Sequence, residues 1–124
     1  MKWTPILIIV AILVVVFILK QAGQISPKDA LSYLKEGALV IDVRSRGEFG
    51  SGHLQSAINI PLDEISSALP QRVSDKNQVL LLHCQSGMRS GVAVKKLRGM
   101  GYTKVYNLGS LQRAGDLVGN AGLD

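Results

Sequence analysis

Two short, almost uninterrupted apolar stretches place the tightest limits on how this chain can fold. They cover residues 38–43, broken only by Asp42, and residues 79–83. A strand that is apolar at successive positions has both faces buried, which is typical of a parallel sheet covered by helices on both sides. Further strands are predicted over residues 57–60 and 104–108. The sequence therefore predicts an α/β domain with a mainly parallel central sheet.

Helix signals lie between these strands. Ser26 and Pro27 suit an N-cap and a first helical position, and Gly37 would end that helix. A second helix is predicted near residues 90–98, and with its two neighbouring strands it would form a right-handed crossover unit. A chain of 124 residues is long enough for one such domain and too short for two.

The apolar stretch Ile6–Leu19 does not belong to that domain. A helix over residues 3–19 would extend roughly 25 Å, against about 30 Å for a bilayer core. Trp3 and Lys20 stand where residues of the membrane interface are expected. A cleaved signal peptide fits less well, because Lys20 occupies a place where a small residue would be wanted. A core helix fits poorly, because the stretch is apolar on every face.

These observations divide the chain into a transmembrane anchor (1–20), a linker (21–25) and one domain (26–124). We expect a single-pass protein of the bacterial inner membrane, in contact with lipid through residues 3–19. Lys20, Lys28 and Lys35 follow the apolar stretch, whereas Lys2 precedes it. This distribution slightly favours a domain on the cytoplasmic side.

Composition excludes several classes of function. The formal net charge is +5, and the 14 basic residues are scattered among nine acidic ones, so nothing points to nucleic acid. A single cysteine rules out an internal disulfide and a thiolate-rich zinc site. We predict neither a metal nor a cofactor.

That one cysteine, Cys84, is the strongest candidate for chemistry. It begins a loop, residues 84–89, that joins a predicted strand to a predicted helix, at the sheet edge where ligands bind in open α/β folds. The N–H groups and dipole of the helix N-terminus, together with Arg89, should lower the pKa of the thiol. Gly87 allows the backbone to curl around the sulfur. His83, as a strand neighbour, should point to the opposite face, and we interpret it as structural.

Two motifs in this order resemble those of the rhodanese-like sulfurtransferase family. The first runs from Ile41-Asp42-Val43-Arg44 through Glu48-Phe49 and Gly52-His53-Leu54 to Ala57-Ile58-Asn59-Ile60-Pro61. The second is Cys84-Gln85-Ser86-Gly87-Met88-Arg89-Ser90. The resemblance covers about residues 25–108. It implies an α/β fold with a central parallel sheet flanked by helices, and a single-domain sulfurtransferase.

The resemblance also implies roles for individual residues. Cys84 would be the nucleophile that takes the outer sulfur of a small anionic donor such as thiosulfate and passes it from a persulfide to a thiol or protein acceptor. The loop would bind the donor, with Arg89 bracing the loop or holding the anion. The loop residues are Gln85, Ser86, Gly87, Met88 and Arg89. Four further residues would support the loops at the sheet edge: Asp42, Arg44, Glu48 and His53.

Two other functions stay open at this point. One is a non-enzymatic rhodanese-like module that binds a partner or senses redox state at the membrane. The other is a cysteine phosphatase, which is disfavoured because only four residues separate Cys84 from Arg89, where phosphatases have five. The chain also departs from many relatives after its last strand, where it has Gly109-Ser110 and no tryptophan. The sequence therefore does not decide whether a helix after Leu111 closes the domain.

Overall fold

The computed structural model describes residues 2–123, apart from the side chains of residues 19–22. Within these residues four strands form one sheet, in the order β2-β1-β3-β4, and every pairing is parallel. The strands are β1 (Leu39–Asp42), β2 (Ala57–Asn59), β3 (Leu80–His83) and β4 (Val105–Gly109). The predicted α/β fold with a parallel central sheet is confirmed.

Helices connect the strands and cover both faces of the sheet. They are α1 (Thr4–Ala22), α2 (Pro27–Lys35), α3 (Arg46–Ser51), α4 (Ile65–Arg72), α5 (Met88–Gly99) and α6 (Leu111–Asn120), with a 3₁₀ turn, η1, at Leu62–Glu64. Helix α2 begins as predicted, because the backbone N–H of Asp29 donates to Ser26 Oγ at 3.2 Å and Pro27 occupies the first turn.

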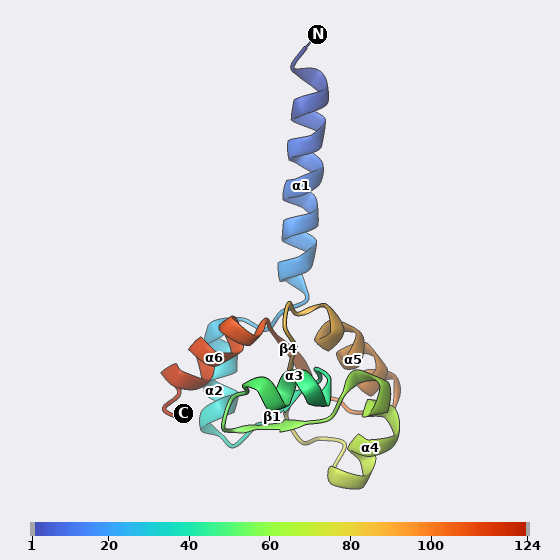
Figure 1. Cartoon of the computed structure of the whole chain (residues 1–124), viewed down its shortest axis with the longest axis vertical. Coiled ribbons are helices and arrows are strands. Elements are labelled where there is room, and N and C mark those ends of the chain that lie inside the picture. Colours follow the sequence, from blue (N-terminus) through green and yellow to red (C-terminus); the bar gives the residue numbers. More distant parts are fainter. Residues whose placement is uncertain (1, 124) are drawn as a thin grey trace.

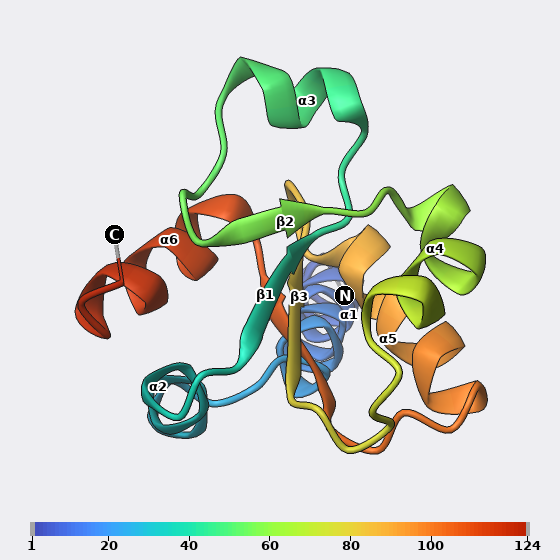
Figure 2. The same ribbon diagram turned by 90° about the horizontal axis from the view of Figure 1, so that it is seen from below.

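The sheet separates two apolar cores, and alternate residues of each strand point into different ones. Ile41, Leu80 and Leu82 pack towards α4 and α5. Val40 and Leu81 pack towards α2 and α6. Figure 2 shows the two helix pairs on opposite sides of the sheet. This two-sided burial is why the central strands are apolar at consecutive positions.

The carboxyl ends of β1 and β3 meet at one edge of the sheet. Asp42 lies beside His83 in the parallel register, so the residues that follow both strands emerge together. Cys84 comes directly after β3, and Arg44 comes two residues after β1. The fold therefore brings the two family motifs to the same place, although about forty residues separate them in the chain.

Helix α1 projects away from the domain (Figure 1), and its apolar side chains through Ile18 are exposed. Among the described residues no helix is both long and apolar enough to cross a membrane. The structure therefore does not support the expected transmembrane helix over residues 3–19.

Three helices go beyond what the sequence predicted. Helix α6 is present after Leu111, which settles the question that the missing family residues left open, and its N-cap is Ser110. Helix α3 is a single short helix between β1 and β2, and α4 contains Pro70. Helix α5 begins at Met88, two residues before its predicted start.

Candidate active site

The loop after β3 closes around the sulfur of Cys84. The backbone N–H of Gly87 donates to Cys84 Sγ at 3.0 Å, and Ser90 Oγ lies 3.6 Å from the same sulfur. Gly87 has a φ of +95°, which lies in the left-handed region. A Cβ at this position would lie 3.1 Å from Gln24 Nε2 and 3.2 Å from Gly109 Cα. Only glycine fits the turn that aims this N–H at the sulfur.

The surroundings of Cys84 favour its thiolate. Burial acts to raise the pKa of the thiol, but the N–H and hydroxyl of Ser90 and the N–H groups of Gly87 and Ser86 outweigh it and lower the pKa below its ordinary value. All of these donors belong to the loop or to the first turn of α5. The residue itself is 0% exposed.

The side chain of Arg89 forms an ion pair with the carboxylate of Glu48. Its Nη1 and Nη2 donate to the two carboxylate oxygens of Glu48, at 2.7 and 2.9 Å. Glu48 lies in α3, where it also accepts from the N–H and hydroxyl of Ser45 in a capping box. The hydrogen bonds from Arg89 and from the Ser45 N–H lower the pKa of Glu48 to about 2. This ion pair ties α3 to the Cys84 loop.

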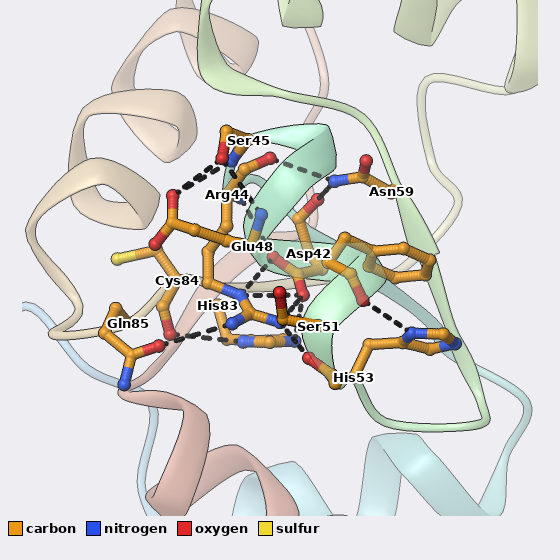
Figure 3. A network of polar contacts seen from close by, with 12 residues as sticks. Asp42, Arg44, Ser45, Glu48, Ser51, His53, Asn59, His83, Cys84 and Gln85 are labelled. Atoms are coloured by element: carbon orange, nitrogen blue, oxygen red, sulfur yellow. Dashed lines mark hydrogen bonds and ion pairs between the residues drawn. The ribbon is translucent and has the colours of Figure 1, made fainter.

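A second ion pair is buried behind the loop. Arg44 donates to both carboxylate oxygens of Asp42, and its Nη2–Asp42 Oδ2 contact is 2.8 Å long. The same guanidinium reaches the Gly52 carbonyl at 2.7 Å and Gln85 Oε1 at 3.3 Å. Figure 3 shows these contacts converging from both motifs. Arg44 thus connects the carboxyl end of β1, the end of α3 and the start of the Cys84 loop.

His83 lies beneath this pair and is completely buried. Its Nδ1 is 3.3 Å from the carbonyl oxygen of Cys84, and its Nε2 is 3.8 Å from Asp42 Oδ2 without a hydrogen bond. Burial lowers the pKa of the imidazole despite the nearby carboxylate, and so favours the neutral ring. His83 therefore packs behind the loop rather than facing the sulfur.

His53, the remaining predicted support residue, lies on the outside of α3. Its ring stacks on Phe49 with centroids 3.7 Å apart, and its Nδ1 is 2.8 Å from the Phe49 carbonyl oxygen. The structure thus joins Asp42, Arg44 and Glu48 to the loop and leaves His53 at the periphery.

Asn107 is a site residue that sequence reasoning did not identify. Its Oδ1 accepts from Ser90 Oγ at 2.7 Å and from the Gly109 N–H at 2.9 Å. Its Nδ2 donates to the Gly87 carbonyl at 3.0 Å. A buried amide in the middle of a strand was the available signal, because such a group needs partners. Asn107 holds in place the two residues that contact the sulfur.

No cluster of three or more His, Cys, Asp or Glu side chains with metal-binding geometry occurs in the described part of the chain. A surface hollow of about 440 Å³ lies at the opposite end of the sheet, near Arg72 and Gln78, and includes none of the predicted site residues.

Comparison with known proteins identifies the family of the chain. Residues 26–112 match the family described as "Rhodanese-like domain". This chain belongs to that family. Over 72 residues it is 43% identical to the thiosulfate sulfurtransferase PspE of Escherichia coli (strain K12), covering 58% of this chain and 69% of PspE.

Two further relatives span more of the chain. The thiosulfate sulfurtransferase GlpE of Pseudomonas entomophila is 35% identical over 85 residues, which cover 68% of this chain and 76% of GlpE. The structure of the human single-domain sulfurtransferase TSTD1 aligns with a TM-score of 0.63 at 30% identity, covering 74% of this chain and 94% of TSTD1. The names of these relatives support a sulfurtransferase activity for the present rhodanese-like chain.

Proposed function

We propose that this protein is a sulfurtransferase that carries a sulfane sulfur as a persulfide on Cys84. The observation that supports the proposal most directly is the Gly87 N–H, which donates to the Cys84 sulfur at 3.0 Å from the N-terminal end of α5. Such donors stabilise a thiolate at neutral pH, and a thiolate is the form that attacks sulfur.

In the first half-reaction the Cys84 thiolate attacks the outer sulfur of a thiosulfate-type donor. A bond forms between Cys84 Sγ and that sulfur, the sulfur–sulfur bond of the donor breaks, and sulfite leaves with the electron pair. In the second half-reaction an acceptor thiolate attacks the outer sulfur of the persulfide. Cys84 departs as a thiolate, and the acceptor becomes a persulfide. Both steps conserve charge and need no other oxidant.

The loop supports these steps by donating hydrogen bonds from fixed backbone positions. The N–H groups of Ser86, Gly87 and Ser90 favour the anionic sulfur, and Asn107 keeps Gly87 and Ser90 in place. Preorganised donors of this kind stabilise charge without reorganising during the reaction. Gln85 and Met88 are exposed on the same loop, and we assign the loop residues 85–89 to donor binding.

A steady-state assay tests the proposal. Purified protein should convert thiosulfate and cyanide to thiocyanate and sulfite in equal amounts, and Cys84→Ser should abolish both products. Ser67→Ala, a change of an exposed serine on α4, is the matched control and should retain full activity. If wild-type protein forms no thiocyanate from cyanide with thiosulfate or other sulfane donors, the chain is a non-enzymatic rhodanese-like module instead.

The phosphatase alternative receives no support from the ion pair at the site. A phosphatase uses its arginine to hold phosphate, whereas both terminal nitrogens of Arg89 bind Glu48. The loop of four intervening residues is also shorter than a phosphatase loop. Hydrolysis of an aryl phosphate that depends on Cys84 would overturn this assignment.

We also propose that the domain works attached to a bacterial inner membrane through residues 3–19. Apolar side chains are exposed on every face of α1 through Ile18, with Ile6, Leu13 and Phe17 at 51%, 62% and 60% exposure. None of them belongs to either apolar core of the domain. Contact with lipid would remove this apolar surface from water. The lysine distribution favours a domain on the cytoplasmic side.

Alkaline carbonate extraction of cell membranes tests the attachment. Full-length protein should stay in the membrane pellet, and release into the supernatant would contradict the proposal. A reporter fused after Asp124 then gives the side of the membrane, with reporter activity expected in the cytoplasm. An active reporter outside the cytoplasm would reverse the proposed orientation.

A further inference from the structure

Two arginines are hydrogen-bonded to the Cys84 loop or belong to it, and each is paired with a carboxylate. Arg44 is paired with Asp42, and both are buried, at 4% and 0% exposure. Arg89 is paired with Glu48. Arg89 is the sole charged residue among positions 84–90. Once Cys84 is a thiolate, this set of groups carries a net charge of about −1. The uncharged N–H donors of the loop and the nearby Arg89 guanidinium stabilise that thiolate.

The Arg89–Glu48 pair is well placed to persist. Both terminal guanidinium nitrogens are bound to carboxylate oxygens, and the capping box with Ser45 holds the same carboxylate. The low pKa of Glu48 keeps it ionised at any pH at which the protein is expected to work. Arg89 is close enough to Cys84 for the thiolate to raise the pKa of the guanidinium. Glu48 therefore places a negative charge against Arg89, the charged residue of the Cys84 loop.

We infer that Glu48 is a specificity-determining residue that selects sulfur donors of low negative charge over dianions. The inference rests on the proposed sulfurtransferase function. A dianionic donor must approach a thiolate and the Glu48 carboxylate while Arg89 is neutralised. A donor with one negative charge meets half of that electrostatic cost, because Coulomb energy scales with the charge of the incoming group.

Two donors with the same transferable sulfur separate this effect from the chemistry. Thiosulfate is a dianion, and it gives up its outer sulfur with sulfite as the leaving group. Benzenethiosulfonate is a monoanion, and it gives up the equivalent sulfur with benzenesulfinate as the leaving group. In both reactions the Cys84 thiolate gains one sulfur, the donor sulfur–sulfur bond breaks and the leaving anion takes the electron pair. The two donors differ mainly in charge and in the group attached to sulfur.

The test is Glu48→Gln in the full chain, with both donors and the same acceptor. Glutamine retains an acceptor for the capping box and for Arg89, but it removes the negative charge. We expect kcat/KM to rise about tenfold for thiosulfate and about threefold for benzenethiosulfonate, because the logarithm of the effect follows donor charge. The increase should appear in KM more than in kcat.

Glu64→Gln is the matched control. Glu64 has the same 36% side-chain exposure as Glu48 and is likewise paired with an arginine, Arg46, at 2.8 Å. The Glu64→Gln substitution removes a carboxylate that does not contact the Cys84 loop. The kcat/KM for either donor should therefore change by less than twofold. Glu48→Ala serves as a second variant and should show the same ranking of the two donors.

The outcomes separate the inference from the proposed function. If Glu48→Gln changes kcat/KM equally for both donors, or for neither, Glu48 does not select between donors. Activity of the wild-type protein would still support the proposed sulfurtransferase function. A fall in kcat/KM for both donors would show that the Arg89–Glu48 pair only holds the loop, and would also overturn the role of Glu48 in selection. Failure of wild-type protein to accept sulfur from either donor would instead remove the proposed function.

Discussion

Two arginine–carboxylate pairs flank the Cys84 loop, and they differ sharply in their surroundings. Arg44 and Asp42 are almost fully buried, whereas the side chains of Arg89 and Glu48 are 39% and 36% exposed. A buried charge without its partner is costly, but an exposed one is stabilised by water. The same chemical pair therefore serves as scaffold at the sheet edge and as an adjustable charge beside the sulfur.

The difference extends to what each pair holds. The buried guanidinium contacts Gln85 and the Gly52 carbonyl, and so fixes the relative positions of the two motifs. The exposed guanidinium contacts Glu48 alone among the hydrogen bonds of the described residues. Disrupting the first should unfold the site, and disrupting the second should change how it treats donors. The predictions below follow that order.

The largest effect is expected from Arg44→Leu. This change removes the ion-pair partner of the buried Asp42 and leaves it the hydrogen bond from the backbone N–H of residue 44. Breaking a buried pair in this way typically lowers the free energy of unfolding by about 3–5 kcal/mol. Urea unfolding of the full chain measures it, with Arg46→Leu, at an exposed pair, as the control. A loss below about 1 kcal/mol would mean that the buried pair is not the scaffold of the site.

A smaller effect is expected from Ser90→Ala, which tests whether the Ser90 hydroxyl stabilises the thiolate. Removing the hydroxyl should raise the pKa of Cys84 by about one unit, equivalent to about 1.4 kcal/mol. The pH dependence of iodoacetamide alkylation reports this pKa cleanly, because the chain has a single thiol. An unchanged profile would mean that the Ser90 hydroxyl, which also donates to Asn107 Oδ1 at 2.7 Å, does not stabilise the thiolate.

His83, which lies against the buried pair, should make stability depend on pH. Its pKa is lowered in the folded state, so the unfolded chain takes up the proton first as the pH falls below about 6.5. The free energy of unfolding should therefore decrease from that pH downward and level off below the folded-state pKa. In His83→Leu this part of the pH dependence should vanish. Urea midpoints at several pH values measure this dependence. If the midpoint changes with pH equally in wild type and in His83→Leu, the proposed role of His83 is wrong.

The smallest effect on stability is expected from Glu48→Gln. The pair is largely solvated and glutamine keeps the capping box, so the urea midpoint should match that of wild type. A large loss of stability would place this pair in the scaffold with Arg44 and would erase the contrast between the two. The donor preference described above should change even though the fold does not.

The sequence predicts the parallel sheet and the Cys84 loop because both depend on local patterns. Consecutive apolar residues reveal β1 and β3, and Ser26-Pro27 reveals the start of α2. The glycine and the helix start that follow Cys84 likewise lie within a few residues of it. These features need no knowledge of distant parts of the chain.

What the sequence did not predict depends on contacts over long distances or on short elements. Glu48 and Arg89 are 41 positions apart, and Asn107 is 17 positions from Ser90, so their pairing follows only from the folded sheet. Helix α3 is short, although Ser45 and Glu48 have the spacing of a capping box. Helix α6 could have been recognised from its buried Ala114, Leu117 and Val118 after the Ser110 N-cap.

The persulfide on Cys84 can be tested most directly by intact-mass spectrometry after incubation with thiosulfate and removal of excess donor. One transferred sulfur adds about 32 Da, provided that the thiolate is the attacking group. We predict this single adduct on wild-type protein, its loss on addition of an acceptor thiol, and its absence from Cys84→Ser. An adduct that persists in Cys84→Ser, or no adduct on wild-type protein with any sulfane donor, would contradict a persulfide carried by Cys84.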